Sequence, residues 1–486
     1  MYQKTEEQLR FENFHLPFSG HLDPKNRWVV LAQLIPWNTL EAKYVARFCS
    51  RRMGAPAKPV RMALGALLIK ERCGYFDEET VEQIRENPYL QYFIGLPEFQ
   101  IATPFDPSLM VQFRKRLSAK VLNEVNEIIC GVTVKDQEDL DNSKDPDDKP
   151  PKPPKSSTGG RNQGTLILDA TCAPADIRYP TDGSLLNEAR EKLEAMIDVL
   201  YEPFKEQMTK PRTYRRKARK DYLNLAKSKK PRPAAIRRAI GKQLRYVKRD
   251  LKTIEWLLAL GPNRLSIQQQ NRLEVIRKLY QQQKEMYDTR SHRINDRIVS
   301  ISQPHVRPIV RGKVTADSEF GAKVSVSLVD GFAYIDKLSW DPYHEGVELK
   351  DYVETYHQRF CFYPKAIMAD QIYRTHANWQ FCKEHGIRLS GPKLGRPSKQ
   401  TNKKQRRLEL HDEKIRNSIE GKFGEGKRCY GLARIMAKLK NTSETVITLQ
   451  FLVMNLEHKL RVLLSQFLKV LFFNMGINPI LILGKN

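Results

Sequence analysis

The stretch that decides the fold is GTLILDATCAPADI, which occupies residues 164–177 of the 486-residue chain. Within it, Leu166, Ile167 and Leu168 form a short apolar run that ends at Asp169. Such a run is typical of a buried central strand, and this one carries a carboxylate at its end. A lone aspartate in this place is more often a cap or turn residue than a catalytic one, so the stretch alone leaves the role of Asp169 open.

A second stretch of the same kind is PKAIMADQIY, residues 364–373, whose apolar run ends at Asp370. Between the two stretches, residues 322–340 alternate between apolar and polar side chains, which predicts strands. The pair Asp330-Gly331 divides this segment and predicts a β-hairpin. A helix at 348–360 is expected to follow the hairpin. These elements predict an α/β fold with an acid at the end of two strands.

A basic helix is predicted from HDEKIRNSIEGKFGEGKRCYGLARI, residues 411–435. Arg416, Glu420 and Lys427 are four and seven residues apart, so they share one face of a helix with 3.6 residues per turn. A carboxylate between two cations suits an acid that holds a metal ion near a phosphate backbone. The alternative is that Arg416 and Lys427 form structural salt bridges with Glu420.

The composition favours a polyanionic partner. Lysine and arginine number 83 against 56 acidic residues, which gives a net charge of +27 and a pI of about 9.7. A basic surface kept for solubility is the alternative. The seven cysteines are scattered without a C-x-x-C pair, which argues for a reducing compartment and against a zinc site. No signal peptide is visible, and polar residues interrupt the apolar C-terminal segment, so we expect a cytoplasmic protein.

The chain divides by composition into five parts. They are a helical N-terminal domain at 1–133, a flexible acidic and proline-rich linker at 134–164, an α/β domain at 165–184 and 301–440, a basic helical insertion at 185–300, and a C-terminal helical segment at 441–486. The N-terminal domain is expected to bind DNA, to dimerise, or both. We interpret the C-terminal segment as an amphipathic helix packed on the core.

The insertion is the most basic part of the chain. Residues 209–252 contain 18 lysines and arginines against two acids, a net charge of 18 − 2 = +16. Prolines 231 and 233 are expected to divide this segment into a helical hairpin. With so few acids, ion pairs along the helices cannot explain the cations, so we expect a DNA partner rather than a solvated face. The densest cluster is Arg215, Arg216, Lys217, Arg219 and Lys220.

These residues give the chain a resemblance to the DDE-class transposases of bacterial insertion sequences with a Y-R-E-K signature. Arg416, three residues, Glu420, six residues and Lys427 fit the signature, whereas Glu413 stands where its tyrosine belongs. Asp169, Asp370 and Glu420 fall on the three acids of that family. The resemblance implies a ribonuclease-H-like mixed sheet flanked by helices, interrupted by the basic insertion and preceded by an all-α domain.

The resemblance also implies a function. Such a transposase binds the terminal inverted repeats of its insertion sequence, cuts the DNA and joins it to a target. It is expected to act as a homodimer on double-stranded DNA, at the nucleoid. Two Mg²⁺ ions, for which Mn²⁺ substitutes, are expected to be bridged by Asp169 and held by Asp370 and Glu420. Arg416 and Lys427 would contact phosphate. The alternatives are a metal-dependent nuclease on the same fold and a transposase-derived DNA-binding protein without catalysis.

Overall fold

The computed structural model describes residues 10–17, 20–45, 56–131, 162–261, 264–313, 316–391 and 403–474. The predicted linker at 134–164 therefore lies outside the described residues, except for its last three positions. The end of the predicted C-terminal segment, from residue 475 on, also lies outside them.

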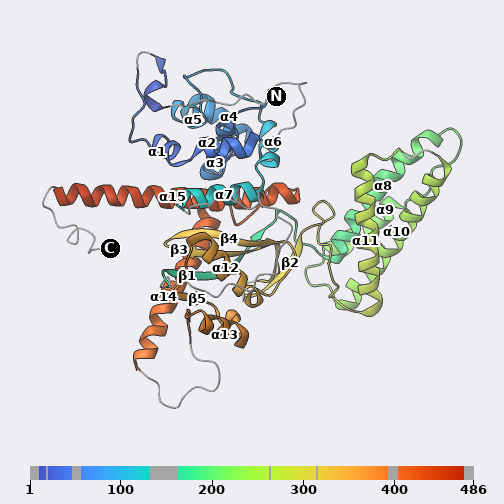
Figure 1. Cartoon of the computed structure of the whole chain (residues 1–486). Coiled ribbons are helices and arrows are strands. Elements are labelled where there is room, and N and C mark those ends of the chain that lie inside the picture. The colour runs from blue at the N-terminus through green and yellow to red at the C-terminus, as the bar shows by residue number, and fades with distance from the viewer. Residues whose placement is uncertain are drawn as a thin grey trace, which may run out of the picture.

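A six-stranded mixed sheet forms the centre of the molecule (Figure 1). The strand order is β2-β3-β1-β5-β6, and β4 pairs with β3. The strands are β1 (Thr165–Pro174), β2 (Arg307–Lys313), β3 (Ala316–Val329), β4 (Phe332–Ser339), β5 (Ala366–Ala369) and β6 (Arg388–Leu389). Strand β1 is antiparallel to β3 and parallel to β5, which puts both acid-bearing strands side by side. The predicted ribonuclease-H-like α/β fold is confirmed.

The turn between β3 and β4 is the predicted hairpin. Asp330 and Gly331 both have positive φ angles, of 50° and 83°. Two consecutive residues with positive φ match the twist of the flanking strands, and Asp-Gly adopts them at little cost. The Asp-Gly pair thereby fixes which residues of β3 and β4 face each other.

Helices cover both faces of the sheet. On β1, Leu166 and Leu168 belong to a buried cluster with α12 (Leu349–Phe360), whereas Ile167 belongs to a cluster with α14 (Lys403–Cys429). Side chains alternate between the faces of a strand, so an apolar run at consecutive positions requires cover on both sides. Helix α13 (His376–Glu384) lies between β5 and β6 in the chain.

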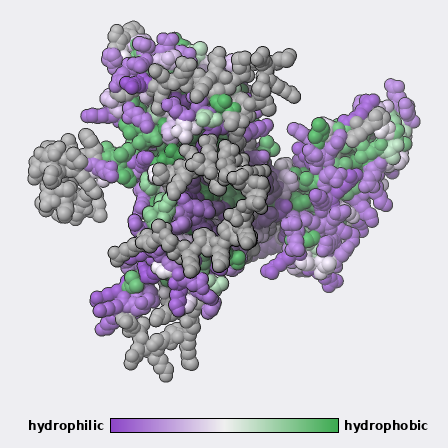
Figure 2. Space-filling model, viewed as in Figure 1, coloured by the Kyte–Doolittle hydropathy of each residue, from purple (hydrophilic) through white to green (hydrophobic). Residues whose placement is uncertain are grey.

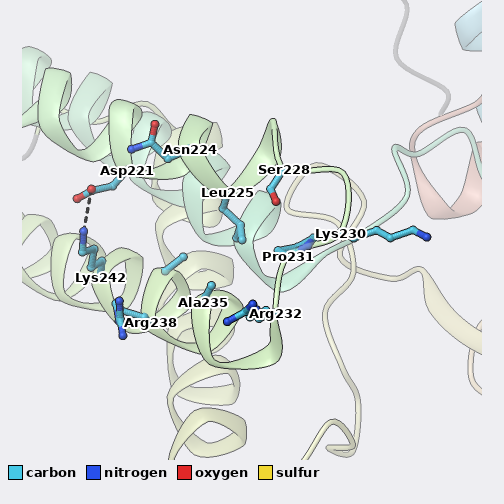
Figure 3. A pocket seen from close by; sticks show the side chains of 11 residues that line it. Asp221, Asn224, Leu225, Ser228, Lys230, Pro231, Arg232, Ala235, Arg238 and Lys242 are labelled. Carbon is cyan, nitrogen blue, oxygen red and sulfur yellow. Dashed lines mark hydrogen bonds and ion pairs between the residues drawn. The ribbon is translucent and has the colours of Figure 1, made fainter.

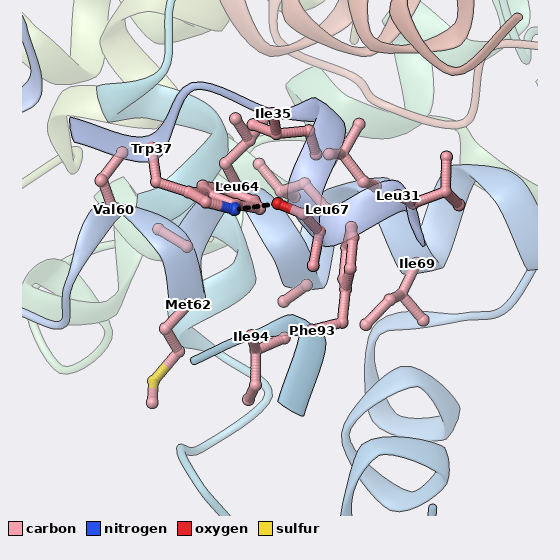
Figure 4. Close-up of a cluster of buried hydrophobic side chains, with 14 of the residues drawn as sticks. Leu31, Ile35, Trp37, Val60, Met62, Leu64, Leu67, Ile69, Phe93 and Ile94 are labelled. Carbon is pink, nitrogen blue, oxygen red and sulfur yellow. Dashed lines mark hydrogen bonds between the residues drawn. The ribbon is translucent and has the colours of Figure 1, made fainter. Parts of the chain in front are cut away.

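The N-terminal part is a helical domain around the buried helix α3, as predicted. Its helices are α1 (Arg27–Leu34), α2 (Trp37–Val45), α3 (Val60–Cys73), α4 (Asp77–Glu86), α5 (Pro88–Phe93), α6 (Leu109–Arg116) and α7 (Ala119–Ile129). Leu64 and Leu67 of α3 pack with Trp37 and Phe93 in this core (Figure 4). The indole N–H of Trp37 donates to the carbonyl oxygen of Ala32 at 2.8 Å, which satisfies a polar group inside the apolar cluster.

Helix α15 (Lys440–Asn474) runs between the N-terminal domain and the sheet (Figure 1). One set of its apolar residues joins the N-terminal core: Leu449, Leu452, Val453 and Leu456. A second set joins the core beneath the sheet: Val446, Ile447, Phe451 and Met454. Helix α15 is therefore apolar on two faces and belongs to two cores through residues 446–456. The apolar segment expected to pack on the core starts only at Leu460, and its residues 461–466 are exposed. Within the part of the chain that the structure describes, no helix has the length and apolarity needed to span a membrane.

The insertion forms a helical bundle with a buried cluster of its own (Figure 1). Its helices are α8 (Asp182–Tyr201), α9 (Arg215–Ala226), α10 (Pro233–Leu260) and α11 (Ile267–Thr289). The hairpin predicted from the two prolines is confirmed, because α9 and α10 lie on either side of Pro231. At the start of α8, Thr181 and Ser184 cap each other's backbone, so the helix begins where the chain leaves the sheet.

Candidate catalytic site

Asp169 and Asp370 occupy equivalent positions on neighbouring parallel strands. The last residues that pair β1 with β5 are Leu168 and Ala369, and each aspartate is the next residue along the chain. Asp370 follows the end of β5, as predicted. The prediction that Asp169 ends its strand is wrong, because β1 continues to Pro174 and stays paired with β3 there. Neighbouring strands are about 4.8 Å apart, so the register brings the two carboxylates close together. Asp169 is two residues after Ile167, so by alternation it belongs to the face that α14 covers.

Helix α14 places a cation and a further acid on this side of the sheet. Its buried residues Ile419 and Phe423 pack beneath β1 and β5. Arg416 and Glu420, one turn apart, form an ion pair with 3.3 Å between a guanidinium nitrogen and a carboxylate oxygen. The Glu420 side chain is 57% exposed, against 23% for Arg416. The structural salt bridge considered as the alternative for Arg416 is therefore present in this structure.

The charges around Asp169 show that the site gathers carboxylates. Burial, together with the smaller effects of the Glu345 and Asp370 carboxylates, raises the pKa of Asp169 to about 6. A hydrogen bond from the Ala170 N–H and the charge of Arg416 act in the opposite direction on this pKa. Like charges that converge on one acid disfavour its ionised form, and a cation placed among them would relieve the repulsion.

The described residues do not contain three His, Cys, Asp or Glu side chains already gathered closely enough to hold a metal ion. Two of the predicted ligands, Asp169 and Asp370, are brought together by the strand register. The third, Glu420, is turned to Arg416. The donor set is nevertheless suited to Mg²⁺, which prefers a few carboxylate oxygens and leaves other positions to water and phosphate.

A pocket of about 390 Å³ opens beside Asp370. Three arginines line it: Arg374 from the turn after β5, and Arg406 and Arg416 from α14. Glu413, at the position of the signature tyrosine, lines the same pocket. The Nε of Arg374 is buried and has no hydrogen-bond partner among the described residues. Asp370, Glu409 and Asp412 line the pocket as well, so its charge is mixed, and its guanidinium groups are the part suited to phosphate oxygens.

Comparison with known proteins identifies this arrangement. Residues 367–457 match the family model "Transposase DDE domain", and residues 17–116 match "Transposase domain (DUF772)". The "Uncharacterized protein ORF8 in nfe locus" of Rhizobium meliloti is 36% identical over 175 residues, which are 35% of this chain and 73% of that relative. The chain belongs to the DDE transposase family. No solved structure matches the transposase in the comparison made.

The two matched regions cover different parts of the transposase. The DDE-domain match includes Asp370, Glu420, Arg416 and Lys427, whereas Asp169 lies before it in the chain. The Y-R-E-K type of the transposase stays a prediction, because the matches name the DDE domain without a subtype. Lys427 lies two turns after Glu420 on α14, as the spacing predicts.

Three residues at this end of the transposase sheet were not singled out from sequence: Glu345, Tyr373 and Arg374. Glu345 precedes a predicted helix, where an acid is expected simply because it favours the helix N-terminus. Arg374 and Tyr373 follow Asp370 within four residues, so closeness to a candidate acid was the available signal. Their contacts depend on how two turns pack, which residue spacing does not encode.

The predicted DNA-binding cluster of the transposase insertion is mostly open to solvent. Arg216, Lys217, Arg219 and Lys220 are exposed on α9. Arg215 is instead occupied inside the bundle, because its guanidinium lies 2.5 Å from Asp198 and 2.9 Å from the carbonyl oxygen of Glu194. The structure thus separates four accessible cations from one that joins α9 to α8.

The exposed surface around α9 and α10 is polar (Figure 2). A second pocket, also about 390 Å³, lies where these two helices meet (Figure 3). Lys230, Arg232 and Arg238 line it, and Lys242 forms a 2.9 Å ion pair with Asp221 there. Cations of α10 and of the loop before it thus face the same region, which is suited to a long anionic partner such as DNA.

Proposed function

We propose that this transposase binds the terminal inverted repeats of its own insertion sequence and catalyses metal-dependent DNA cleavage and strand transfer. The observation that carries the proposal is the register of β1 and β5, which sets Asp169 and Asp370 side by side on the face covered by α14. We further propose that Glu420 is the third acid and joins the other two when its ion pair with Arg416 opens.

Divalent cations are the cofactors of this proposal. Asp169 would bridge two Mg²⁺ ions, or Mn²⁺ in their place, and Asp370 and Glu420 would hold one each. Such ions would stabilise charge on the attacking and leaving oxygens of an in-line phosphoryl transfer. The protein's own part is to hold the carboxylates on rigid elements, so that little reorganisation is needed at the moment of reaction.

The DNA would follow a basic path away from these acids. The pocket of Arg374, Arg406 and Arg416 lies directly beside Asp370 and would hold backbone phosphates near the scissile bond. Lys427, which lies further along α14, would contact another phosphate of the backbone. The exposed cations of α9 would bind a more distant part of the double helix.

The remaining domains complete the proposal. The helical N-terminal domain would bind the DNA ends, dimerise, or do both, and we propose the domain division given by the sequence, with the insertion starting at α8 (Asp182–Tyr201). Two ends must be brought together before they are joined, so we propose a homodimer on DNA, acting at the nucleoid. The separate buried clusters of the N-terminal helices and of the insertion support their treatment as distinct units.

The proposal is tested by nicking and strand transfer on a plasmid that carries the DNA flanking this protein's gene. Wild type is compared with Asp370→Asn, in Mg²⁺ and in Mn²⁺. Asp351→Asn is the matched control, because Asp351 is an exposed aspartate on α12. We expect cleavage at the element's ends and joined products from wild type and the control, and neither from Asp370→Asn.

Two other outcomes would point to the alternative functions. Cleavage without joined products would indicate a metal-dependent nuclease on the same fold. Binding of the ends without any metal-dependent cleavage would indicate a transposase-derived DNA-binding protein. Cleavage by Asp370→Asn at the wild-type rate would show that the acids are misassigned.

A further inference from the structure

A fourth carboxylate, that of Glu345, lies beside the candidate site. It is the first residue of a short 3-10 helix (Glu345–Val347) that precedes α12. The ammonium group of Lys323, on β3, lies 2.7 Å from one carboxylate oxygen of Glu345. The hydroxyl of Tyr373 donates to the other oxygen at 3.3 Å. The carboxylate, 14% exposed, is therefore fixed by two elements of the sheet domain.

The turn that carries Glu345 is joined to the turn that carries Asp370. The Asn378 side-chain amide donates to the carbonyl oxygens of Gly346, at 2.6 Å, and Tyr373, at 2.9 Å. The two turns also touch directly, because a Cβ added to Gly346 would lie 2.2 Å from the carbonyl oxygen of Ile372. Neither turn can shift without moving the other, so the position of Glu345 is linked to that of the turn after β5.

The charge of Glu345 reaches Asp169. It is the carboxylate with the largest effect on the pKa of Asp169, ahead of Asp370. Tyr373 joins Glu345 to the Asp370 turn: its side chain is fully buried, its hydroxyl donates to Glu345, and its backbone N–H donates to the carbonyl oxygen of Asp370 at 3.1 Å. A chain of contacts thus runs from Lys323 through Glu345 and Tyr373 to the end of β5.

We propose that Glu345 is a positioning residue for a divalent-cation site at Asp169 and Asp370. Held by Lys323 and Tyr373, it fixes the Asp370 turn against β1 and adds negative charge around the cation. It acts through these neighbours rather than as a ligand. The inference rests on the proposed function, because it presupposes that the acids bind a metal ion. Residues that orient metal ligands typically contribute 10–100-fold to metal affinity.

The test measures the binding of Mn²⁺ to the full-length protein without DNA, with electron paramagnetic resonance as the method of detection. We expect Glu345→Gln to raise the Kd for Mn²⁺ by about 10-fold or more. Glu348→Gln is the matched control, because Glu348 lies three residues further on and forms a similar ion pair, 2.7 Å from Lys337. This control should bind Mn²⁺ as wild type does.

A second variant covers the case in which Glu345→Gln does not fold. Tyr373→Phe keeps the buried ring and removes only the hydroxyl that holds Glu345, so it should raise the Kd by a smaller factor. In cleavage assays, both variants should need more Mn²⁺ for half-maximal rate, and excess Mn²⁺ should restore most of the maximal rate. Thermal melting of each variant checks the fold.

The outcomes separate this inference from the proposed function. If Glu345→Gln and Tyr373→Phe bind Mn²⁺ as wild type does and only melt earlier, Glu345 is a structural residue and the inference is wrong. If wild type binds no Mn²⁺, the inference is also wrong. If Glu345→Gln loses Mn²⁺ affinity but wild type cuts no DNA, the inference stands and the proposed function fails.

Discussion

The acid-bearing end of the sheet and the basic insertion differ in how each positions its charges. At the sheet end, Asp169 and Asp370 stand at one register position of two hydrogen-bonded strands. On the insertion, many cations stand on exposed helix faces, and others, among them Arg215, Lys242 and Arg249, are held by ion pairs. The sheet fixes the relative positions of two carboxylates, whereas the insertion provides a broad positive electrostatic potential.

This difference predicts how strongly single substitutions affect each region. Chemistry on a phosphodiester depends on fixed placement of a few oxygen ligands, so single substitutions at the sheet end should have large effects. Backbone binding to DNA is the sum of many weak contacts, so single substitutions on the insertion should have small effects. The predictions below test this contrast, beginning with the largest expected effect.

Replacing one acid of the sheet end should abolish catalysis without unfolding the protein. Asp169→Asn removes a half-buried charge but keeps the size of the side chain, so we expect a loss of cleavage of about 10³-fold or more with a melting temperature no lower than that of wild type. End-labelled cleavage assays and thermal melting measure the two quantities. A variant that loses activity only in proportion to lost folded protein would contradict the assignment.

The two glutamates of α14 offer a comparison within one helix. Glu420→Gln should lose cleavage almost as completely as Asp169→Asn, whereas Glu425→Gln should keep it within about tenfold. Glu425 lies 140° around the helix from Glu420 by ideal geometry. It pairs with Lys422 at 3.3 Å and with Arg461 of α15 at 2.8 Å, so its expected role is to join two helices. Equal losses in the two variants would mean that the wrong glutamate has been chosen.

Removing the accessible cluster of α9 should weaken DNA binding in a salt-dependent way. The variant changes four residues to glutamine: Arg216, Lys217, Arg219 and Lys220. Each lost phosphate contact lowers the slope of log K against log salt by about 0.9, so the slope should fall by up to about 3.6. Fluorescence anisotropy with a labelled duplex at several salt concentrations measures the slope.

A matched variant of α11 controls for the change in net charge. It changes four cations outside the most basic segment to glutamine: Arg272, Arg277, Lys278 and Lys284. Its salt slope should stay near that of wild type if DNA binds along α9. A slope reduced equally by both variants would instead show that only the total charge of the insertion matters.

The smallest expected effect is a pH dependence inside the insertion. Asp250 is buried, and neither carboxylate oxygen has a hydrogen-bond partner among the described residues. Burial, with a smaller effect of Glu194 and against the charge of Arg249, raises its pKa to about 7. The folded state therefore holds a proton that the unfolded state releases above its ordinary pKa near 4, so stability falls as the pH rises from about 4 to 7.

Asp250→Asn should remove this dependence. Asparagine stays neutral, so the variant should be more stable than wild type at pH 8 by about 1–3 kcal/mol and similar at pH 4. Urea unfolding at both pH values measures the difference. An equal stability difference at both pH values would show that Asp250 is ionised throughout.

The parts that the sequence predicted well are those encoded by neighbouring residues. The apolar runs that end at Asp169 and Asp370 predicted β1 and β5, and Asp330-Gly331 predicted the hairpin between β3 and β4. In each case the pattern of side chains is itself the local cause of the structure, through burial on both faces or through positive φ.

The parts that the sequence did not predict depend on contacts between distant segments. Glu345 reads as an ordinary helix-start acid until its turn meets the turn of Asp370, 25 residues later. The ion pair between Arg416 and Glu420 and a metal site that includes Glu420 are both compatible with the same spacing. The apolar composition of the C-terminal segment drew attention to the residues from Leu460 on, but it did not reveal that the preceding residues of α15 serve two cores.

Because helix α15 contributes to two cores and is synthesised late, both cores can be completed only after the C-terminal part of the chain has been made. The N-terminal helices leave the ribosome first, yet their core lacks Leu449, Leu452, Val453 and Leu456 until α15 has been made. The sheet waits for the same helix, which supplies Phe451 and Met454. Both units are therefore completed by one late event. A chain cut short before residue 440 would present neither a finished N-terminal domain nor a finished sheet.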